Sequence, residues 1–369
     1  MYYIGLMSGT SLDGIDVALA RFSGDTSELE DYVSKPFSPA LRNTLLQLCA
    51  TSDDEIEQMG RAQGQLAAEY AAVIQHLLEK NQINAREVKA IGCHGQTVRH
   101  RPDIDMPFTL QLVDASRLAV LTGIDVVSDF RSKDMALGGQ GAPLAPGFHH
   151  AFFARHVAQQ DVVIVNIGGI ANLTVLPHRS NTDVLGFDSG PGNGLMDAWM
   201  QNYCAQDYDK DGVFAASGRI NQMLLDACLQ DDYFAKPMPK STGREYFNLD
   251  WVRHRIERLQ TTPEHQDVLA TLTELTAVTI ADAIKHTSAS SKVFICGGGA
   301  YNTYLMQRLS QHLDQQVQST AELGLSPDAV EAMAFAWLAH AHIERLAGNI
   351  PAVTGASRQA VLGSLTPWQ

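Results

Sequence analysis

The chain has few cysteines, few cations and no long apolar run, and each shortage excludes a class of protein. Its 369 residues include five cysteines, and no two of them form a C-x-x-C pair. This usage argues against a disulfide framework or a zinc site and favours reduced thiols in the cytoplasm. No apolar stretch reaches about 18 residues, and the amino terminus has no basic region before an apolar run, so we expect neither secretion nor a membrane span. The formal net charge of −14 argues against nucleic acid and anionic membranes as partners.

Several motifs of common enzymes are also absent. The sequence has no G-x-x-x-x-G-K-[ST], which excludes a Walker-type phosphate loop, and no G-x-S-x-G, which excludes a hydrolase nucleophile elbow. It has no H-E-x-x-H and no G-x-G-x-x-G, so zinc-dependent and dinucleotide-dependent chemistry are poorly supported. What the chain does contain is 45% hydrophobic and 18% charged residues, which is enough apolar material for two ordered domains.

The first sixteen residues contain a turn of unusual composition. Apolar runs over 2–7 and 15–20 flank the turn 8–14, a pattern that predicts a β-hairpin. The turn holds three hydroxyls, two glycines and a carboxylate. Glycine lets backbone N–H groups approach an anion closely, and hydroxyls can bond to its oxygens. Taken alone, the turn fits a phosphate-binding hairpin and an ordinary tight turn equally well.

Two further glycine turns follow apolar strands later in the chain. The strand 161–167 runs into Gly168 and Gly169 and then into a second strand ending at 176, and the strand 293–296 runs into Gly297, Gly298 and Gly299. The chain therefore has a strand–glycine turn–strand unit in each half, with the glycine- and proline-rich stretch 138–146 as the candidate crossing between domains. Helices are predicted by apolar spacing over 39–50, 56–80, 195–202, 267–285 and 329–346.

Asp188 is the strongest candidate for chemistry. It ends an apolar strand and precedes Ser189 and a Gly-Pro-Gly turn that leads into the helix 195–202. Backbone donors near that helix would stabilise an ionised carboxylate, which could take a proton from an attacking oxygen. The alternative, a carboxylate that only caps a helix or turn, is common and is the better interpretation of this position in isolation.

Other polar residues follow predicted strands, where α/β proteins bind ligands. His94 follows the strand 88–93, and Arg131 follows the strand 124–127 and could bind a carboxylate or phosphate with two hydrogen bonds. Asp13 and Asp16 flank the first turn and could hold Mg²⁺ through water, since Mg²⁺ uses few protein carboxylates. The alternatives are a structural histidine and solvated turn carboxylates.

Together these motifs resemble one family, the anhydro-N-acetylmuramic acid kinases of the sugar kinase, Hsp70 and actin superfamily. The resemblance covers nearly the whole chain, and only Ser189, where the family is expected to have Thr, departs from it. The matching stretches are, in order, MSGTSLDGID (7–16), GCHGQT (92–97), DFR (129–131), GGQGAPL (138–144), NIGGIANLT (166–174), GFDSGPGN (186–193), KSTGREYFN (240–248), CGGGAYN (296–302), DAVEAMAFAWLA (328–339) and TGAS (354–357).

The resemblance implies a fold and a set of ligands. The fold would be α/β, with two actin-like (ribonuclease H-like) domains and an interdomain nucleotide cleft, divided into 1–130 plus 350–369 and 131–349. ATP with Mg²⁺ would bind there, and closure of the two domains is a further expectation. The implied ATP-binding residues are Gly9, Thr10, Ser11, Leu12, Asp13, Gly14, Ile15, Asp16, Gly168, Gly169, Gly297, Gly298 and Gly299.

The resemblance also implies an uncommon reaction. ATP phosphorylates O6 of 1,6-anhydro-N-acetylmuramic acid while water opens the 1,6-anhydro bridge, which gives N-acetylmuramic acid 6-phosphate and ADP in cell-wall recycling. Asp188 matches the catalytic aspartate that activates the water, and His94, Arg131 and Glu331 are candidates for contact with the sugar. A cytoplasmic homodimer is expected. The competing interpretations are a non-catalytic ATP-binding switch, for which no spare segment is evident, and a conventional hexose or N-acetylhexosamine kinase.

Overall fold

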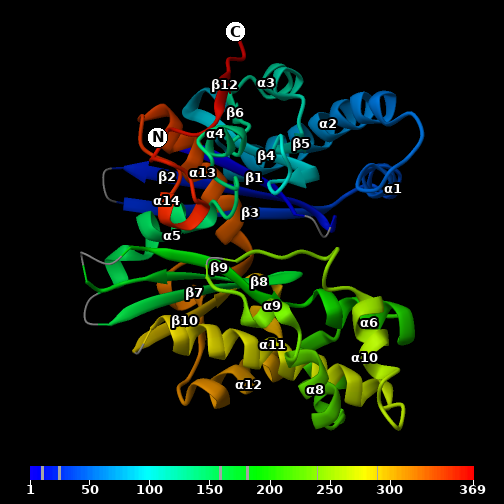
Figure 1. Cartoon of the computed structure of the whole chain (residues 1–369). Coiled ribbons are helices and arrows are strands. Elements are labelled where there is room, and N and C mark those ends of the chain that lie inside the picture. Colours follow the sequence, from blue (N-terminus) through cyan, green and yellow to red (C-terminus); the bar gives the residue numbers. More distant parts are fainter. Residues whose placement is uncertain (10–11, 24–25, 158–159, 180–182, 239, 289) are drawn as a thin grey trace. The chain divides into compact units, whose positions relative to one another are not determined.

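The chain folds into two compact units. A computed structural model describes residues 1–9, 12–23, 26–157, 160–179, 183–238, 240–288 and 290–369. Unit 1 comprises Met1–Phe152 and Ala329–Gln369, and unit 2 comprises Phe153–Asp328. Figure 1 shows the elements of both units along the chain.

Unit 1 is built on a sheet that has seven strands in the described part of the chain, in the order β12-β6-β4-β1-β2-β3, with β5 paired to β4. β1, β2 and β3 form an antiparallel meander, and β4 and β6 run parallel to β1 and β4 respectively. The elements of this unit are β1 (Tyr2–Ser8), β2 (Gly14–Ser23), β3 (Thr26–Pro36), α1 (Pro39–Leu48), α2 (Glu55–Asn81), β4 (Val88–Arg101), β5 (Phe108–Leu112), α3 (Ala115–Thr122), β6 (Val126–Ser128), α4 (Ser132–Ala136), α5 (Ala145–Phe153, ending at the unit boundary), α13 (Val330–Ile343), α14 (Pro351–Thr354) and β12 (Ser364–Thr366).

The two faces of this sheet are covered by different helices. Leu66, Tyr70 and Ile74 of α2 share one helical face and pack in one core with Val17 and other strand side chains. The other face receives α13, which is almost wholly buried. The helix approaches the strands closely, since a Cβ built on Gly5 would lie 1.8 Å from the carbonyl oxygen of Ala332. α13 therefore belongs structurally to the amino-terminal strands.

Unit 2 repeats the strand plan on a smaller scale. Its sheet has five strands among the described residues, in the order β11-β10-β7-β8-β9, with β7, β8 and β9 antiparallel and β10 and β11 parallel to the strands beside them. The elements are β7 (Asp161–Ile167), β8 (Ile170–Leu176), β9 (Leu185–Pro191), α6 (Gly194–Tyr203), α7 (Val213–Ser217), α8 (Gln222–Leu229), α9 (Asp232–Ala235), α10 (Leu249–Ile256), α11 (His265–Thr287), β10 (Ser291–Cys296), the 3₁₀ turn η4 (Gly298–Tyr301), α12 (Thr303–Leu313) and β11 (Gln318–Ser319).

The core of unit 2 lies between this sheet and α11. Val163 and Val165 of β7 are fully buried and pack in one cluster with Leu272 and Leu275 of α11. Every residue of β7 after Asp161 is buried, and the alternate side chains Val163 and Val165 share the face that packs with α11, most of whose residues are also buried. Because β7 and β8 are antiparallel, the chain reverses at the glycine turn that joins them.

The structure confirms the mixed α/β fold and the strand–turn–strand unit in each half. The expectation that β4 ends before His94 is wrong, because the strand continues to Arg101 by pairing with β5. The compact units divide at 152/153 and 328/329, whereas the sequence placed the boundaries at 130/131 and 349/350, and 138–146 lies inside unit 1. The later boundary differs because α13 packs on β1 and β4, which places residues 329–349 in unit 1. In the described part of the chain, no helix combines the length and apolar character that a membrane crossing requires.

Candidate active site

Asp188 lies near the end of β9, where the ladder with β8 is irregular. Asp188 pairs with Asn172 and Gly190 pairs with Ala171, so Ser189 is an extra residue in β9. The Ser189 hydroxyl donates to the carbonyl oxygen of Ala171 at 3.3 Å, which keeps it inside the sheet. Bulges of this kind redirect side chains and are frequent beside functional sites.

A loop that is distant in sequence fixes the carboxylate of Asp188. The backbone N–H of Thr242 donates to Asp188 Oδ2 at 2.9 Å, and the backbone N–H of Asp188 donates to the carbonyl of Lys240 at 2.9 Å. The Tyr233 hydroxyl donates to the carbonyl of Asp188 at 2.7 Å. The Lys240 ammonium is used within this arrangement, because it donates to the carbonyls of Tyr233 and Phe234 at 3.1 and 3.0 Å. The residue is thus held by both its main chain and its side chain.

The environment of Asp188 raises its pKa from 3.8 to about 7. Burial is the largest cause, the nearby Glu245 carboxylate adds to it, and the Thr242 N–H acts in the opposite direction. This differs from the expectation of a carboxylate stabilised by helix donors, because the donor comes from the 240–242 loop. A carboxyl group with a pKa near neutrality is well suited to accept a proton at physiological pH.

Three glycine segments of unit 2 lie against one another. The carbonyl of Gly168 accepts from Asn193 N–H at 2.7 Å, and the carbonyl of Gly169 accepts from Gly192 N–H at 3.1 Å. A Cβ built on Gly299 would lie 2.4 Å from Ile167 Cγ2, so the third segment packs against the same turn. The structure therefore brings Gly168, Gly169 and Gly297–Gly299 together around the β7–β8 turn, and at Gly169, Gly297 and Gly299 a Cβ would lie within 3 Å of a neighbouring atom.

A pocket adjoins the third glycine segment. It has a volume of ≈ 520 Å³ and includes Ala300, Tyr301 and Ser326 in its lining. The Tyr301 hydroxyl donates to Asp328 Oδ2 at 2.8 Å, which holds the ring at the edge of η4. This volume lies within the range of pockets that bind small molecules.

The first turn lies in unit 1 and is partly described. Thr10 and Ser11 lie outside the described residues. Gly9 and Leu12 close the turn through a hydrogen bond from Leu12 N–H to the Gly9 carbonyl at 3.2 Å, and Gln96 Nε2 donates to the same carbonyl at 3.1 Å. Leu12 has a φ of +57° and is buried with Ile15, so both anchor the turn to the core. A Cβ on Gly14 would lie 2.4 Å from the Lys35 carbonyl oxygen, which gives this glycine a structural role.

His94, Arg131 and Glu331 gather on the α13 side of the unit 1 sheet. His94 packs against Phe335 with ring centroids 4.7 Å apart, and Glu331 lies one helical turn before Phe335 on α13. Arg131 donates to His94 Nε2, from Nη2 at 2.9 Å. His94 Nδ1 lies 3.3 Å from the Ser8 carbonyl oxygen, so this nitrogen carries the proton. Both ring nitrogens of His94 are thus occupied, and His94 orients Arg131.

The pKa values of this group agree with that assignment. Burial, and next the Arg131 charge, lower the pKa of His94 to about 3, so the ring is neutral at pH 7. Burial lowers the pKa of Arg131 to about 10, while Glu331 and Asp134 oppose the shift, and the guanidinium remains charged. Loss of hydration, and next the Asp16 carboxylate, raise the pKa of Glu331, although Arg131 acts against the rise. The group therefore contains one cation, Arg131, and the carboxyl group of Glu331.

Asp134 holds Arg131 in place indirectly, through the backbone of Gly141. Its carboxylate is fully buried and accepts from Gly141 N–H at 2.8 Å, from Asn349 Nδ2 at 2.7 Å and from the Thr354 hydroxyl at 2.8 Å. The Gly141 carbonyl in turn accepts from Arg131 Nη1 at 2.7 Å. The buried aspartate therefore holds the loop that holds the arginine.

The two candidate metal ligands occupy different environments. Asp13 is exposed at the tip of the first turn, and Asp16 is half-buried in β2 and accepts a hydrogen bond from the Tyr32 hydroxyl at Oδ1. Among the residues that the structure describes, no three His, Cys, Asp or Glu side chains form a group that could enclose a metal ion.

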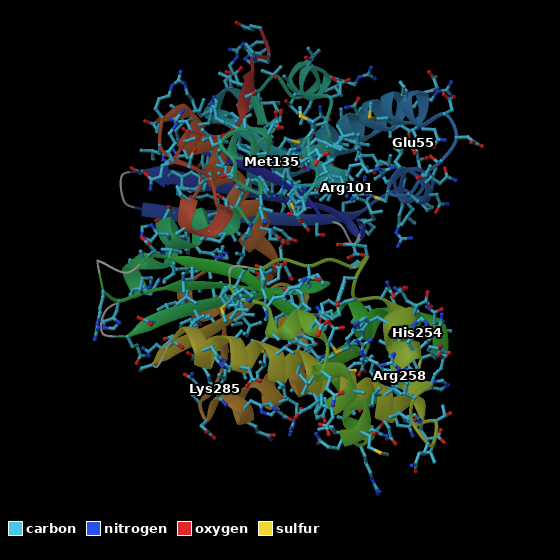
Figure 2. The ribbon with its side chains drawn as sticks, in the orientation of Figure 1. Glu55, Arg101, Met135, His254, Arg258 and Lys285 are labelled. Carbon is cyan, nitrogen blue, oxygen red and sulfur yellow. The ribbon has the colours of Figure 1, made fainter. Side chains whose placement is uncertain are left out.

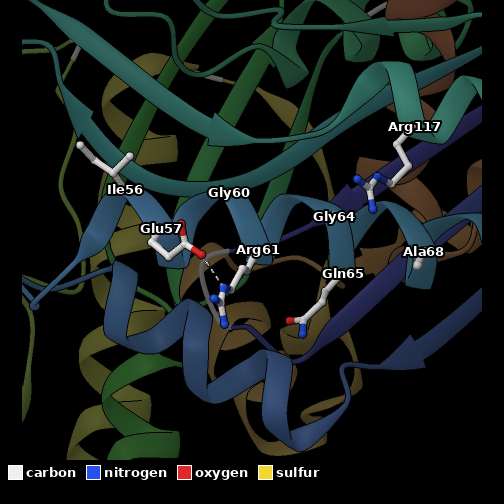
Figure 3. A pocket seen from close by; sticks show the side chains of 8 residues that line it. All are labelled: Ile56, Glu57, Gly60, Arg61, Gly64, Gln65, Ala68 and Arg117. Atoms are coloured by element: carbon white, nitrogen blue, oxygen red, sulfur yellow. Dashed lines mark hydrogen bonds and ion pairs between the residues drawn. The ribbon is translucent and has the colours of Figure 1, made fainter.

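A second pocket, of ≈ 570 Å³, is separate from these residues. It lies over α2 and α3 and is lined by Ile56, Gly60, Gly64 and Arg117, among others (Figure 3). None of the candidate site residues lines it.

Sequence reasoning missed the residues that hold the site together. Thr242 acts through its backbone N–H, Tyr233 through a hydroxyl 45 residues from Asp188 in sequence, and Asn193 through its backbone in the turn. No local pattern identifies such contacts. In the sequence, the match of the stretch 240–248 to the family is the signal that points to this loop.

Comparisons with known proteins identify the family of the chain. The profile of the family described as "Anhydro-N-acetylmuramic acid kinase" matches residues 1–368. An anhydro-N-acetylmuramic acid kinase from Shewanella halifaxensis is 49% identical over 367 residues, which cover 99% of this chain and 98% of that protein. The protein of the same name from Saccharophagus degradans is 48% identical over 367 residues, covering 98% of each.

Among solved structures, the activator of the 2-hydroxyisocaproyl-CoA dehydratase from Clostridium difficile with bound ADPNP covers 94% of this chain and 96% of its own, with a TM-score of 0.45 and 11% identity. The family profile and the full-length identity of the curated relatives decide the assignment. The chain belongs to the anhydro-N-acetylmuramic acid kinase family.

Proposed function

We propose that Asp188 is the catalytic base of this chain, which its family makes an ATP-dependent kinase of anhydro-N-acetylmuramic acid in peptidoglycan recycling. The observation that carries the proposal is the carboxyl group itself. It is fixed at 2.9 Å by the Thr242 N–H, and its pKa is raised to about 7. A base of this kind holds a proton loosely enough to take one from water and later release it.

The substrate decides what the base must do. An ether bridge joins C1 to O6, and the bridging oxygen has no proton for a base to remove. Asp188 instead takes a proton from water as the water oxygen bonds to C1. The C1–O6 bond breaks, O6 bonds to the γ-phosphorus of ATP, and ADP leaves. The products are N-acetylmuramic acid 6-phosphate and ADP.

The sugar is bound through the unit 1 group. Arg131 supplies hydrogen-bond donors and Glu331 supplies a carboxylate that can accept from sugar hydroxyls. His94 acts through Arg131, because both of its ring nitrogens are already bonded. The guanidinium is held by two partners and therefore loses little freedom on binding.

The nucleotide is bound through the glycine turns. The ≈ 520 Å³ pocket beside Gly298–Tyr301 suits the nucleoside, and the turn at Gly168 and Gly169 suits phosphate oxygens. The residues 9–16 of the first turn are assigned to the phosphates and to Mg²⁺, with Asp13 and Asp16 bound through water. Mg²⁺ supplies neutralisation of charge on the phosphoryl oxygens when it is bound.

The proposal extends to the cytoplasm and to a homodimer. The cysteines at positions 49, 93, 204 and 228 form no disulfide, which suits a reducing compartment that also contains ATP. Sedimentation at micromolar concentration tests the dimer, and a monomer mass under these conditions contradicts it.

The reaction is tested by measuring ADP release with Mg·ATP and purified anhydro-sugar, with N-acetylmuramic acid and glucose as control acceptors. Turnover is expected with the anhydro-sugar alone. In ¹⁸O-water the label should enter the product at C1 and stay out of the phosphate. Asp188→Asn should lower kcat by several orders of magnitude while nucleotide affinity stays within about twofold. Turnover of glucose without the anhydro-sugar, or label in the phosphate, contradicts the assignment.

A further inference from the structure

Arg244 lies directly over the β7–β8 glycine turn. A Cβ built on Gly169 would lie 2.7 Å from Arg244 Nε, 2.8 Å from Nη2 and 3.2 Å from Cζ. These distances place the guanidinium across the Cα of Gly169, in the space that any other residue would fill. The lack of a side chain at position 169 therefore lets a cation lie on the turn.

The guanidinium has no protein partner in the described part of the chain. Arg255 and Arg308, in the same unit, each bind a carboxylate at 2.6 Å, whereas no ion pair or hydrogen bond joins the Arg244 side chain to another described residue. The side chain is exposed in a chain whose formal net charge is −14. An unpaired arginine in so acidic a protein has its five donors available for a ligand.

The loop that carries Arg244 is fixed on both sides. Before it, Thr242 N–H binds the Asp188 carboxylate at 2.9 Å. After it, the backbone N–H groups of Tyr246 and Phe247 donate to the Gly243 carbonyl at 3.1 and 3.0 Å, and Phe247 is buried in the core. The loop that holds the base thus also presents a cation to the turn.

The turn beneath the guanidinium is prepared for an anion. The carbonyls of Gly168 and Gly169 already accept hydrogen bonds from the 192–194 backbone, so neither oxygen is left to repel negative charge. A guanidinium binds phosphate oxygens with two parallel hydrogen bonds. Its positive charge stabilises the phosphoryl group more strongly during transfer, when negative charge spreads over three phosphoryl oxygens.

We infer that Arg244 binds the terminal phosphoryl group of the nucleotide during transfer, an inference that rests on the proposed function of the Gly168–Gly169 turn. In this role Arg244 is a catalytic residue, and it touches the group that moves to O6. The sugar substrate also carries an anion, its lactyl carboxylate, which could bind Arg244 in place of the phosphoryl group. The experiment below distinguishes these two ligands.

The test compares Arg244→Gln and Arg244→Lys with Arg258→Gln, which removes an exposed arginine just after α10 (Figure 2). Affinities for a non-hydrolysable ATP analogue and for ADP are measured with Mg²⁺, alongside kcat and the KM of the sugar. Arg244→Gln should lower kcat at least 100-fold and weaken the analogue at least tenfold, with ADP changed less than twofold. Arg258→Gln should change none of these values, and Arg244→Lys should restore part of the analogue affinity.

Other outcomes overturn the inference. If Arg244→Gln weakens the binding of ADP and of the ATP analogue equally, Arg244 does not contact the terminal phosphoryl group. A raised KM for the sugar with unchanged analogue binding assigns Arg244 to the carboxylate. If the unchanged protein turns over no anhydro-sugar, the proposed function fails, but the nucleotide comparison still decides the role of Arg244 in binding.

Gly169→Ala provides an independent check. The added methyl group should displace the flexible guanidinium and weaken the analogue in the otherwise unchanged protein. In the Arg244→Gln background the same change should have less than a twofold effect, because the two substitutions remove one interaction. Full additivity of the two effects contradicts the contact.

Discussion

At the scale of single residues, the protonation of Asp188 controls the reaction. Because the carboxyl group must be ionised to accept a proton from water, kcat/KM should fall about tenfold per pH unit below a pKa near 7. The pH at which kcat/KM begins to fall should lie well above the usual pKa range of an aspartate, because burial opposes the charged form. Initial rates from pH 5 to 8.5, with Mg·ATP saturating, measure it. A limb near pH 4 contradicts the raised pKa of the base.

Residue identities could be predicted from the sequence where a motif places them, and their surroundings could not. Asp188 was identified from the strand and turn around it, but the donor to its carboxylate belongs to Thr242, 54 residues later. His94 is predicted to contact the sugar, but the sequence does not show that its two ring nitrogens bond to Ser8 and Arg131. Such contacts depend on how distant segments meet, and no spacing in the sequence records that.

At the scale of elements, the close packing of α13 on the unit 1 sheet requires glycine at position 92. A Cβ there would lie 1.9 Å from the carbonyl oxygen of Phe335, which is backbone and cannot move aside cheaply. Gly92→Ala should therefore lower the free energy of unfolding by about 3 kcal/mol. It should also lower activity, because Phe335 packs on His94. Urea unfolding followed by circular dichroism measures the change.

Gly60→Ala is the matched control for this substitution. Gly60 lies within α2, and a Cβ there meets nothing within 4 Å. The same chemical change should therefore raise stability by about 0.5–1 kcal/mol, since alanine favours the helix. Equal effects at the two positions would show that the spacing between α13 and β4 does not limit stability.

Element boundaries followed the sequence where apolar periodicity was strong. The strand 161–167 and the long helices α2 and α11 agree with prediction to within a few residues. β4 is longer than the sequence predicts, because its second half, residues 94–101, is polar apart from Gly95 and Val98 and becomes a strand by pairing with β5. Pairing between strands, rather than local preference, decides such segments.

At the scale of the whole molecule, one strand plan occurs twice. β1–β2–β3 and β7–β8–β9 are both antiparallel meanders, and in each unit the first strand pairs in parallel with a later strand, β4 or β10. The sequence indicates the strand–glycine turn–strand units but not the order of the strands, since that order depends on long-range pairing. Assigning residues 329–349 to the first unit also required the structure, because α13 and β1 are separated by most of the chain.

Among the described residues, the apolar cluster of unit 1 and the apolar cluster of unit 2 share no member, which predicts how each unit loses its packing. One cluster contains residues between 4 and 126, and the other contains residues between 163 and 317. Since each unit encloses its own apolar cluster, loss of packing in one should not expose the other. In native hydrogen exchange, Gly92→Ala should accelerate the amides of Ile4 and Ile91 in unit 1 by about 100-fold, which corresponds to about 3 kcal/mol at 25 °C. The amides of Val163 and Ile295 in unit 2 should change less than twofold. Equal acceleration in both units would mean that the chain opens as one cooperative unit, and Gly60→Ala should accelerate neither group.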